Sequence, residues 1–131
     1  MIANFNRWFD PQDTFRGSGT YEAWAENFGG FKGELTDEGL PKSNFDGIEK
    51  VDELTVLIHL NTPDLQFLNK LANPAFAIIS PDYLAGRTES ADGGTGPYSI
   101  GESTASGQTL EPNPEYWNPA AIPTSSMEIT P

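Results

Sequence analysis

The sequence predicts an α+β fold, in which several short helices accompany a small, mixed and largely antiparallel β-sheet. Two stretches near the N-terminus carry apolar side chains at helical spacing. Short alternating runs bounded by turn residues, at 47–60 and 98–111, are typical of antiparallel hairpins. The chain has 131 residues, a length that suits one domain with one hydrophobic core.

Two helices are expected in the first 30 residues. The first has apolar residues on one face: Ile2, Phe5, Trp8 and Phe9. The second carries a similar stripe: Tyr21, Trp24, Ala25 and Phe28. Ser18 or Thr20 is the expected N-cap of the second helix, and Gly29 its expected end. Because large aromatic side chains dominate core burial, we expect Trp8 and Trp24 in the core.

A long surface loop and then a hairpin are expected next. Residues 29–47 contain few apolar side chains, which should pin this loop to the protein: Phe31, Leu35, Leu40 and Phe45. The hairpin spans 47–60 and turns at Asp52 and Glu53. Alternate residues of its second strand should share one face: Leu54, Val56, Ile58 and Leu60.

The middle of the chain predicts three short elements. A helix should begin at 62–64, where Thr62 suits the cap, Pro63 the first turn and Asp64 the positive end of the helix dipole. Its expected buried stripe comprises Leu65, Leu68, Leu71 and Ala72. Residues 75–79 read as a buried strand, 80–86 as a short capped helix and 87–94 as a polar loop.

The stretch 93–117 organises the chain. Glycines at 93, 94 and 96 allow unusual or crowded backbone, and Pro97 restricts the residue before it. We therefore expect Gly96→Val to destabilise the protein and Gly93→Ala to be milder. Strands at 98–100 and 109–111 should form a hairpin, and 126–130 a last strand. Tyr116 and Trp117 lie in a proline-flanked loop, as candidates for exposed aromatics.

The composition excludes several functions. The net charge is −12, and no Lys or Arg follows residue 87, so the chain should repel nucleic acid and anionic membranes. No stretch reaches the ~18 apolar residues of a membrane span. There is no cysteine, and His59, the single histidine, is expected as a half-exposed strand residue. We therefore predict no catalytic residue, metal site or cofactor; a catalytic triad would need His59.

Two other functions stay open from the residues alone. Tyr116 and Trp117 could make the chain a free-standing carbohydrate-binding module. The 19 acidic residues also allow a carboxylate pair for glycoside hydrolysis, although no pair stands out. Four loop acids are read as solvated rather than as a calcium site, because they lack the spaced Asp/Asn-Gly pattern: Asp10, Asp13, Asp37 and Glu38.

One resemblance covers nearly the whole chain. Two motifs resemble the GTGPY and N-x-x-Y-W patterns of the family 5 extracellular solute-binding proteins, which are the oligopeptide- and dipeptide-binding receptors of ABC importers. The motifs comprise eight positions, which we expect to be structural: Gly94, Thr95, Gly96, Pro97, Tyr98, Asn113, Tyr116 and Trp117. The segments 4–8, 47–58 and 62–68 resemble a helix, a hairpin and a second helix of the same family.

The resemblance implies a subdomain of a type II periplasmic-binding-protein-like fold. Residues 1–92 look like an inserted subdomain of the first lobe, and 93–131 like the return segment of the parent lobe. The start of the chain does not resemble a signal peptide, and with the short length this predicts a fragment.

The same resemblance implies a binding protein rather than an enzyme. Its partners would be the remaining lobes, ABC permease subunits and a peptide or small-solute ligand. Its location would be extracellular or periplasmic, with lipoprotein anchoring of the parent. No ligand contact is carried over from the family, and Tyr116 and Trp117 are the only ligand-binding candidates. The hairpin at 98–113 lacks the basic residue of many members, which leaves the ligand open.

Overall fold

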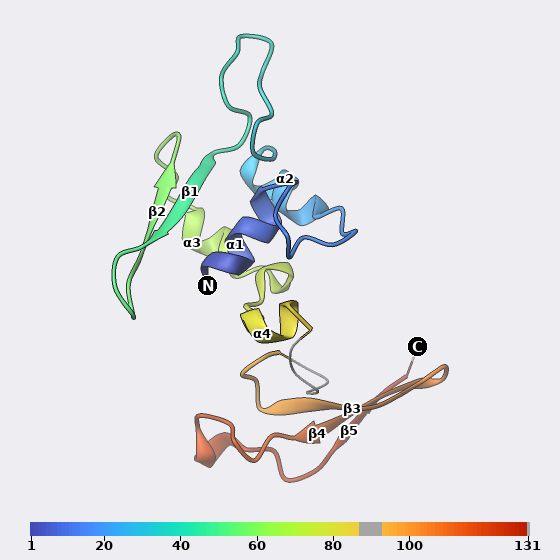
Figure 1. Cartoon of the computed structure of the whole chain (residues 1–131). Helices are drawn as coiled ribbons and strands as arrows, with labels where there is room; N and C mark the ends of the chain where they lie inside the picture. The colour runs from blue at the N-terminus through green and yellow to red at the C-terminus, as the bar shows by residue number, and fades with distance from the viewer. Residues whose placement is uncertain (87–92, 131) are drawn as a thin grey trace. The chain divides into compact units, whose positions relative to one another are not determined.

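A computed structural model describes residues 1–86 and 93–130, and the chain divides into two compact units, Met1–Ile78 and Ile79–Pro131 (Figure 1). Within the second unit the Ser80 backbone N–H donates to the Gly93 carbonyl at 2.9 Å, which joins the segment after Ile78 to the later chain. The roles of 1–92 and 93–131 in a parent lobe remain predictions.

Unit 1, residues 1–78, contains three α-helices, one hairpin and one 3₁₀ turn among its described residues. The helices are α1 (Ile2–Phe9), α2 (Glu22–Phe28) and α3 (Phe67–Leu71), and the 3₁₀ turn is η1 (Pro74–Phe76). Strands β1 (Phe45–Lys50) and β2 (Val56–Leu60) pair antiparallel, with a bulge between Phe45 and Gly47. The expected first two helices and the hairpin are confirmed.

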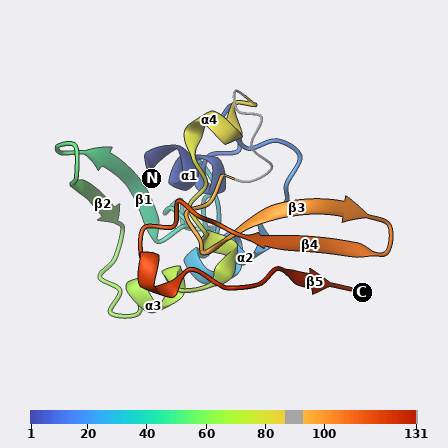
Figure 2. The ribbon, with the colours of Figure 1, turned by 90° about the horizontal axis from the view of Figure 1, so that it is seen from below.

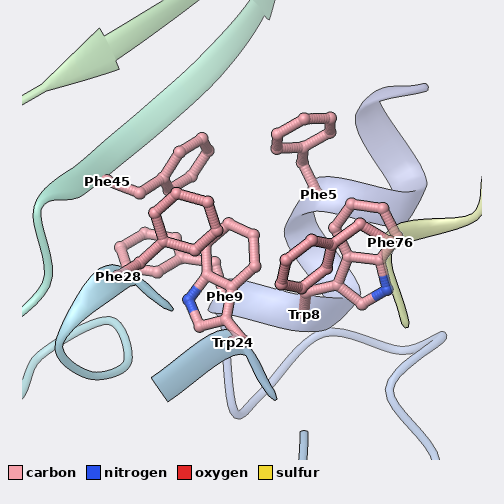
Figure 3. Packing of buried hydrophobic residues seen from close by; sticks show 7 residues of the cluster. All are labelled: Phe5, Trp8, Phe9, Trp24, Phe28, Phe45 and Phe76. Carbon is pink, nitrogen blue, oxygen red and sulfur yellow. The ribbon is translucent and has the colours of Figure 1, made fainter. Parts of the chain in front are cut away.

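The core of unit 1 is built from aromatic side chains. Those that are buried come from α1, α2, β1 and η1, as Figure 3 shows: Phe5, Trp8, Phe9, Trp24, Phe28, Phe45 and Phe76. Trp24 is fully buried, and its ring centroid lies 4.4 Å from that of Phe28 and 5.0 Å from that of Phe45. The prediction that Trp8 and Trp24 are core residues is therefore confirmed.

Arg16 holds the connection between α1 and α2. Its Nη1 donates to the carbonyl of Trp8 at 2.9 Å, at the end of α1. The guanidinium lies 4.6 Å from the Tyr21 ring centroid and 4.5 Å from that of Phe31. Tyr21 in turn donates its hydroxyl proton to the Arg16 carbonyl at 2.6 Å. Arg16 therefore stabilises this connection in two ways: its cation lies between two aromatic rings, and it donates to a carbonyl at the end of α1.

The expected cap of α2 is wrong. The N-cap position is Tyr21, which has a left-handed backbone with φ 54°, and no described side chain caps the helix there. Ser18 and Thr20 do not cap the helix, because Tyr21, whose ring contacts the Arg16 guanidinium, is the residue that precedes it. The expected end is confirmed, since Gly29 is left-handed at φ 88°.

Three of the apolar positions expected to be buried in the loop and hairpin are exposed instead. Leu35 and Leu40 both face solvent, whereas Phe45 is buried and Phe31 half-buried. Leu54 is 98% exposed because β2 begins only at Val56. It lies in the turn, where its N–H donates to the Asp52 carboxylate at 2.8 Å. The alternation of Val56, Ile58 and Leu60 is confirmed, with each of the three half-buried.

The expected helix at 62–72 begins later than predicted. The Thr62 backbone N–H and hydroxyl both donate to the Asn44 side-chain oxygen, at 2.9 and 2.7 Å, which ties Thr62 to the segment before β1. Helix α3 begins at Phe67, which packs against the core together with Leu71. Leu65 is 97% and Leu68 is 78% exposed, and Ala72 is exposed as well, so the predicted buried stripe is wrong for these three residues.

The buried strand expected at 75–79 is also wrong. Residues Pro74–Phe76 form η1, whose N-cap Asn73 accepts the Ala75 N–H on its side-chain oxygen at 3.0 Å. This local hydrogen bond gives the backbone an alternative to strand pairing. The turn directs Phe76 into the core, while Ile78 is exposed.

Unit 2 is a short helix followed by a small sheet. The described elements are α4 (Pro81–Leu84), β3 (Tyr98–Thr104), β4 (Gly107–Pro112), the 3₁₀ turn η2 (Pro119–Ala121) and β5 (Met127–Ile129). The three described strands pair antiparallel in the order β3-β4-β5 (Figure 2). The helix at 80–86, the hairpin and the last strand are confirmed. Most of the loop expected at 87–94 lies outside the described residues.

The predicted α+β class is confirmed, and its strands are divided between two small antiparallel sheets. The cap of α4 follows the expected logic, because the Ser80 Oγ accepts the Tyr83 N–H at 3.1 Å and Pro81 occupies the first turn. None of the helices in the described ranges is long and apolar enough to cross a membrane.

Candidate functional site

Asn113 joins the two sequence motifs of unit 2. Its Nδ2 donates to the Gly96 carbonyl at 3.0 Å, and its backbone N–H donates to the Pro97 carbonyl at 2.8 Å. Its carboxamide oxygen accepts the Glu115 N–H at 3.0 Å, and its carbonyl accepts the Tyr116 N–H at 3.1 Å. One side chain thus fixes the segment before β3 and the turn after β4, and so brings 96–98 and 113–117 together.

The aromatic pair that follows Asn113 is partly open to solvent. The Tyr116 and Trp117 ring centroids lie 5.3 Å apart with the planes tilted by 58°. Trp117 is 74% exposed, whereas Tyr116 is half-buried. An exposed tryptophan next to a second ring is the kind of side chain that stacks on a ligand or packs against another surface. Gly94 and Thr95, at the start of the other motif, are also exposed.

Among the glycines at 93, 94 and 96, the crowded one is Gly93 rather than Gly96. A Cβ at Gly96 would meet a described atom only at 3.9 Å, the Tyr98 carbonyl oxygen, and its backbone is not left-handed. The expected crowding at Gly96 is therefore wrong. A Cβ at Gly93 would lie 2.6 Å from the Ile79 Cγ2 and 2.7 Å from the Tyr83 Cβ. The expectation that Gly93→Ala is the milder change is therefore wrong as well, because it considered only that Gly93 precedes the matched motif.

Gly93→Ala is expected to lower the free energy of unfolding by about 1–3 kcal/mol, because the added methyl group overlaps side chains in a packed region. Urea denaturation would measure the loss. The matched control is Gly96→Ala, which has room and should stay within about 0.5 kcal/mol of the parent chain. A larger loss at Gly96 than at Gly93 would contradict this assignment.

The single histidine pairs with one acidic side chain of the hairpin. His59 Nε2 lies 3.3 Å from a Glu49 carboxylate oxygen, and both side chains are largely exposed on the outer face of the hairpin. This position matches the expected half-exposed strand histidine. Within the described residues, no three His, Cys, Asp or Glu side chains gather closely enough to hold a metal ion.

Nearby hydrogen-bond donors lower the pKa of three described carboxylates and so favour their charged form. The hydrogen bond from Lys32 lowers the pKa of Asp10, and the hydrogen bond from Lys70 lowers the pKa of Asp64. The Leu54 N–H lowers the pKa of Asp52 in the same way. A glycosidase acid needs a raised pKa, so these carboxylates are unsuited to proton donation near neutral pH.

Comparison with known proteins assigns the family. A model described as "Bacterial extracellular solute-binding proteins, family 5 Middle" matches residues 1–130, nearly the whole chain. The chain belongs to this family. Its members have a type II periplasmic-binding-protein-like fold, as the resemblance predicted, and the α+β organisation fits a part of it.

The curated relatives of this family 5 chain are named for small peptides. It is 31% identical over 136 residues to "Di/tripeptide-binding protein 1" of Pseudomonas aeruginosa strain UCBPP-PA14. It is 30% identical over 131 residues to "Di/tripeptide-binding protein 3" of the same strain and to "Dipeptide-binding protein" of strain PAO1. These alignments cover 93–97% of this chain but only 23–24% of each relative. No solved structure matches the chain.

Proposed function

We propose that this family 5 chain is a segment of a larger solute-binding receptor that captures peptides or similar small solutes for an ABC importer. The observation that carries the proposal is the alignment to "Di/tripeptide-binding protein 1", which spans 97% of this chain and 24% of the relative. The segment is then a structural part of the receptor, with little ligand binding of its own. It acts as a binding protein and not as an enzyme.

The proposed place of the segment is the first lobe of the receptor. Residues 1–92 form an inserted subdomain, and 93–131 return the chain to the parent lobe. Asn113 supports this reading, because its hydrogen bonds to the Gly96 and Pro97 carbonyls join the two ends of the 98–112 hairpin within the return segment. The proposed partners are the remaining lobes, the permease subunits of the importer and the peptide ligand. The receptor itself works outside the cytoplasmic membrane, anchored as a lipoprotein.

Thermal melts with ligand test this function. A ligand at about 100 times its dissociation constant stabilises a protein by about 2.7 kcal/mol. We expect the full-length receptor, expressed from the longest reading frame that contains these codons, to melt higher with at least one di- or tripeptide. The 131-residue chain should show no shift, because a lone part of a cleft cannot enclose a peptide. A saturable shift of the 131-residue chain with peptide would contradict the structural role.

The exposed Trp117 supports one second candidate, a carbohydrate-binding module. Its 74% exposed indole, with the Tyr116 ring at 5.3 Å, has the form of a sugar-stacking surface. The same melts with a panel of oligosaccharides distinguish the two functions. A shift with a glycan that Trp117→Ala abolishes would favour the module, whereas no shift with any glycan removes it.

A further inference from the structure

Unit 1 contains an open apolar pocket of about 290 Å³ between α1, β2, α3 and η1, which we call the unit 1 pocket. Its lining includes Phe5, Trp8 and Phe76, three of the core aromatics. Met1, Leu68 and Ile78 also line it, and all three are exposed apolar side chains. The hollow therefore lies over the buried aromatic core and is bordered by exposed apolar side chains.

Exposed apolar side chains around an apolar hollow mark an interaction site more often than a chance arrangement. The volume is slightly below the about 300–1,000 Å³ of typical small-molecule sites, and no charged side chain lines the pocket to orient a ligand. The pocket therefore fits an inserted apolar side chain better than a solute that must be held by polar groups.

The negative charge of the chain argues against two possible occupants of the unit 1 pocket, a membrane surface and a second copy of the chain. A net charge of −12 repels an anionic membrane surface and also a second copy of the same chain. A freely diffusing protein partner would need an interface of roughly 1,000 Å² or more, far larger than one pocket supplies. A segment tethered on the same polypeptide needs much less, because tethering gives an effective concentration on the order of millimolar.

The relatives contain enough additional chain to supply such a segment, since the alignment leaves about three quarters of their length outside it. We propose that the unit 1 pocket receives an apolar side chain from another part of the receptor polypeptide, outside these 131 residues, and so fixes unit 1 to that part. This inference rests on the proposed function, in which the chain is a segment of a longer receptor.

A pair of leucine variants tests the docking. Leu68→Glu puts a charge on the pocket, and Leu65→Glu puts the same charge three residues away, on a side chain that does not line it. In the 131-residue chain both leucines are exposed, at 78% and 97%, so both variants should melt within about 2 °C of the parent chain. In the full-length receptor we expect Leu68→Glu to lower the melting temperature by roughly 4 °C or more, and Leu65→Glu to leave it unchanged.

The fluorescent dye ANS gives a second readout that does not depend on stability. The 131-residue chain should enhance ANS fluorescence, Leu68→Glu should reduce the enhancement, and the full-length receptor should show little of it because the pocket is filled. A receptor that binds peptide but responds equally to both variants, or that binds ANS as strongly as the 131-residue chain, would overturn the docking and leave the proposed function intact.

Two other outcomes would also overturn the docking proposal. Dimers of the 131-residue chain that Leu68→Glu dissociates, measured by sedimentation, would assign the pocket to a second copy and overturn the proposal. A reading frame no longer than these 131 codons would overturn both the proposed function and the docking.

Discussion

Trp24→Ala is expected to lower the free energy of unfolding by ~3–5 kcal/mol. Trp24 is fully buried, and its ring centroid lies within 6.2 Å of those of the six other described core aromatics, from α1, α2, β1 and η1. Removing the indole leaves a cavity that four separate elements line. Because these elements cannot all move inward together, the cavity collapses only in part.

Urea denaturation of the 131-residue chain measures this loss, with Trp117→Ala as the matched control. Trp117 is exposed, so its removal should change the free energy of unfolding by no more than about 0.5 kcal/mol. Trp24→Phe should cost less than Trp24→Ala, since it keeps a ring and removes an indole N–H that has no partner among the described residues. A loss below ~1 kcal/mol for Trp24→Ala would mean that the side chain is not in a packed core.

Phe45→Ala is expected to be nearly as damaging, at ~3–5 kcal/mol. Phe45 is the first residue of β1 and is fully buried. Its ring packs against Phe9 at 4.9 Å in an edge-to-face geometry and against Phe5 at 5.6 Å. It is therefore the one fully buried hairpin side chain among the described residues that packs on α1, and its loss should loosen the hairpin as well as open a cavity.

The control for Phe45 is Leu54→Ala, in the turn of the same hairpin. The sequence places Leu54 on the buried face, whereas the structure exposes it, so the two views predict opposite results. We expect Leu54→Ala to stay within about 0.5 kcal/mol of the parent chain in the same denaturation experiment. A loss above ~2 kcal/mol at Leu54 would show that the turn packs against the protein and that the sequence-based register is correct.

Local chemistry determined several elements without any knowledge of the tertiary structure. The spacing of Phe5, Trp8 and Phe9 predicts α1, because three or four residues make one helical turn and the aromatics fall on one face. Ser80 followed by proline predicts α4, because a serine cap and a proline at the first turn both act within that turn. The alternation in β2 likewise follows from the period of a strand, and the motifs at 94–98 and 113–117 indicated the family.

Other features were decided by partners far away in the sequence. Thr62 carries a good capping hydroxyl, but its N–H and its hydroxyl both donate to the distant Asn44 side chain. Helix α3 begins only at Phe67, and Leu65 and Leu68 are exposed. Tyr21 precedes α2 in a left-handed backbone, next to an arginine that caps a different helix. Such choices depend on which side chains meet in space, and local patterns do not contain that information.

The candidate site likewise has some features that the sequence determined and others that only the tertiary structure decided. The sequence by itself determined that Gly96, Pro97 and Asn113 belong to one pair of motifs and that Trp117 lies in a proline-flanked loop. Only the tertiary structure decided that the Asn113 side chain bonds the Gly96 carbonyl across 17 positions, and that Gly93, and not Gly96, is the crowded glycine. The physical reason is that backbone propensity acts between near neighbours, whereas crowding and hydrogen bonding depend on segments that folding alone brings together.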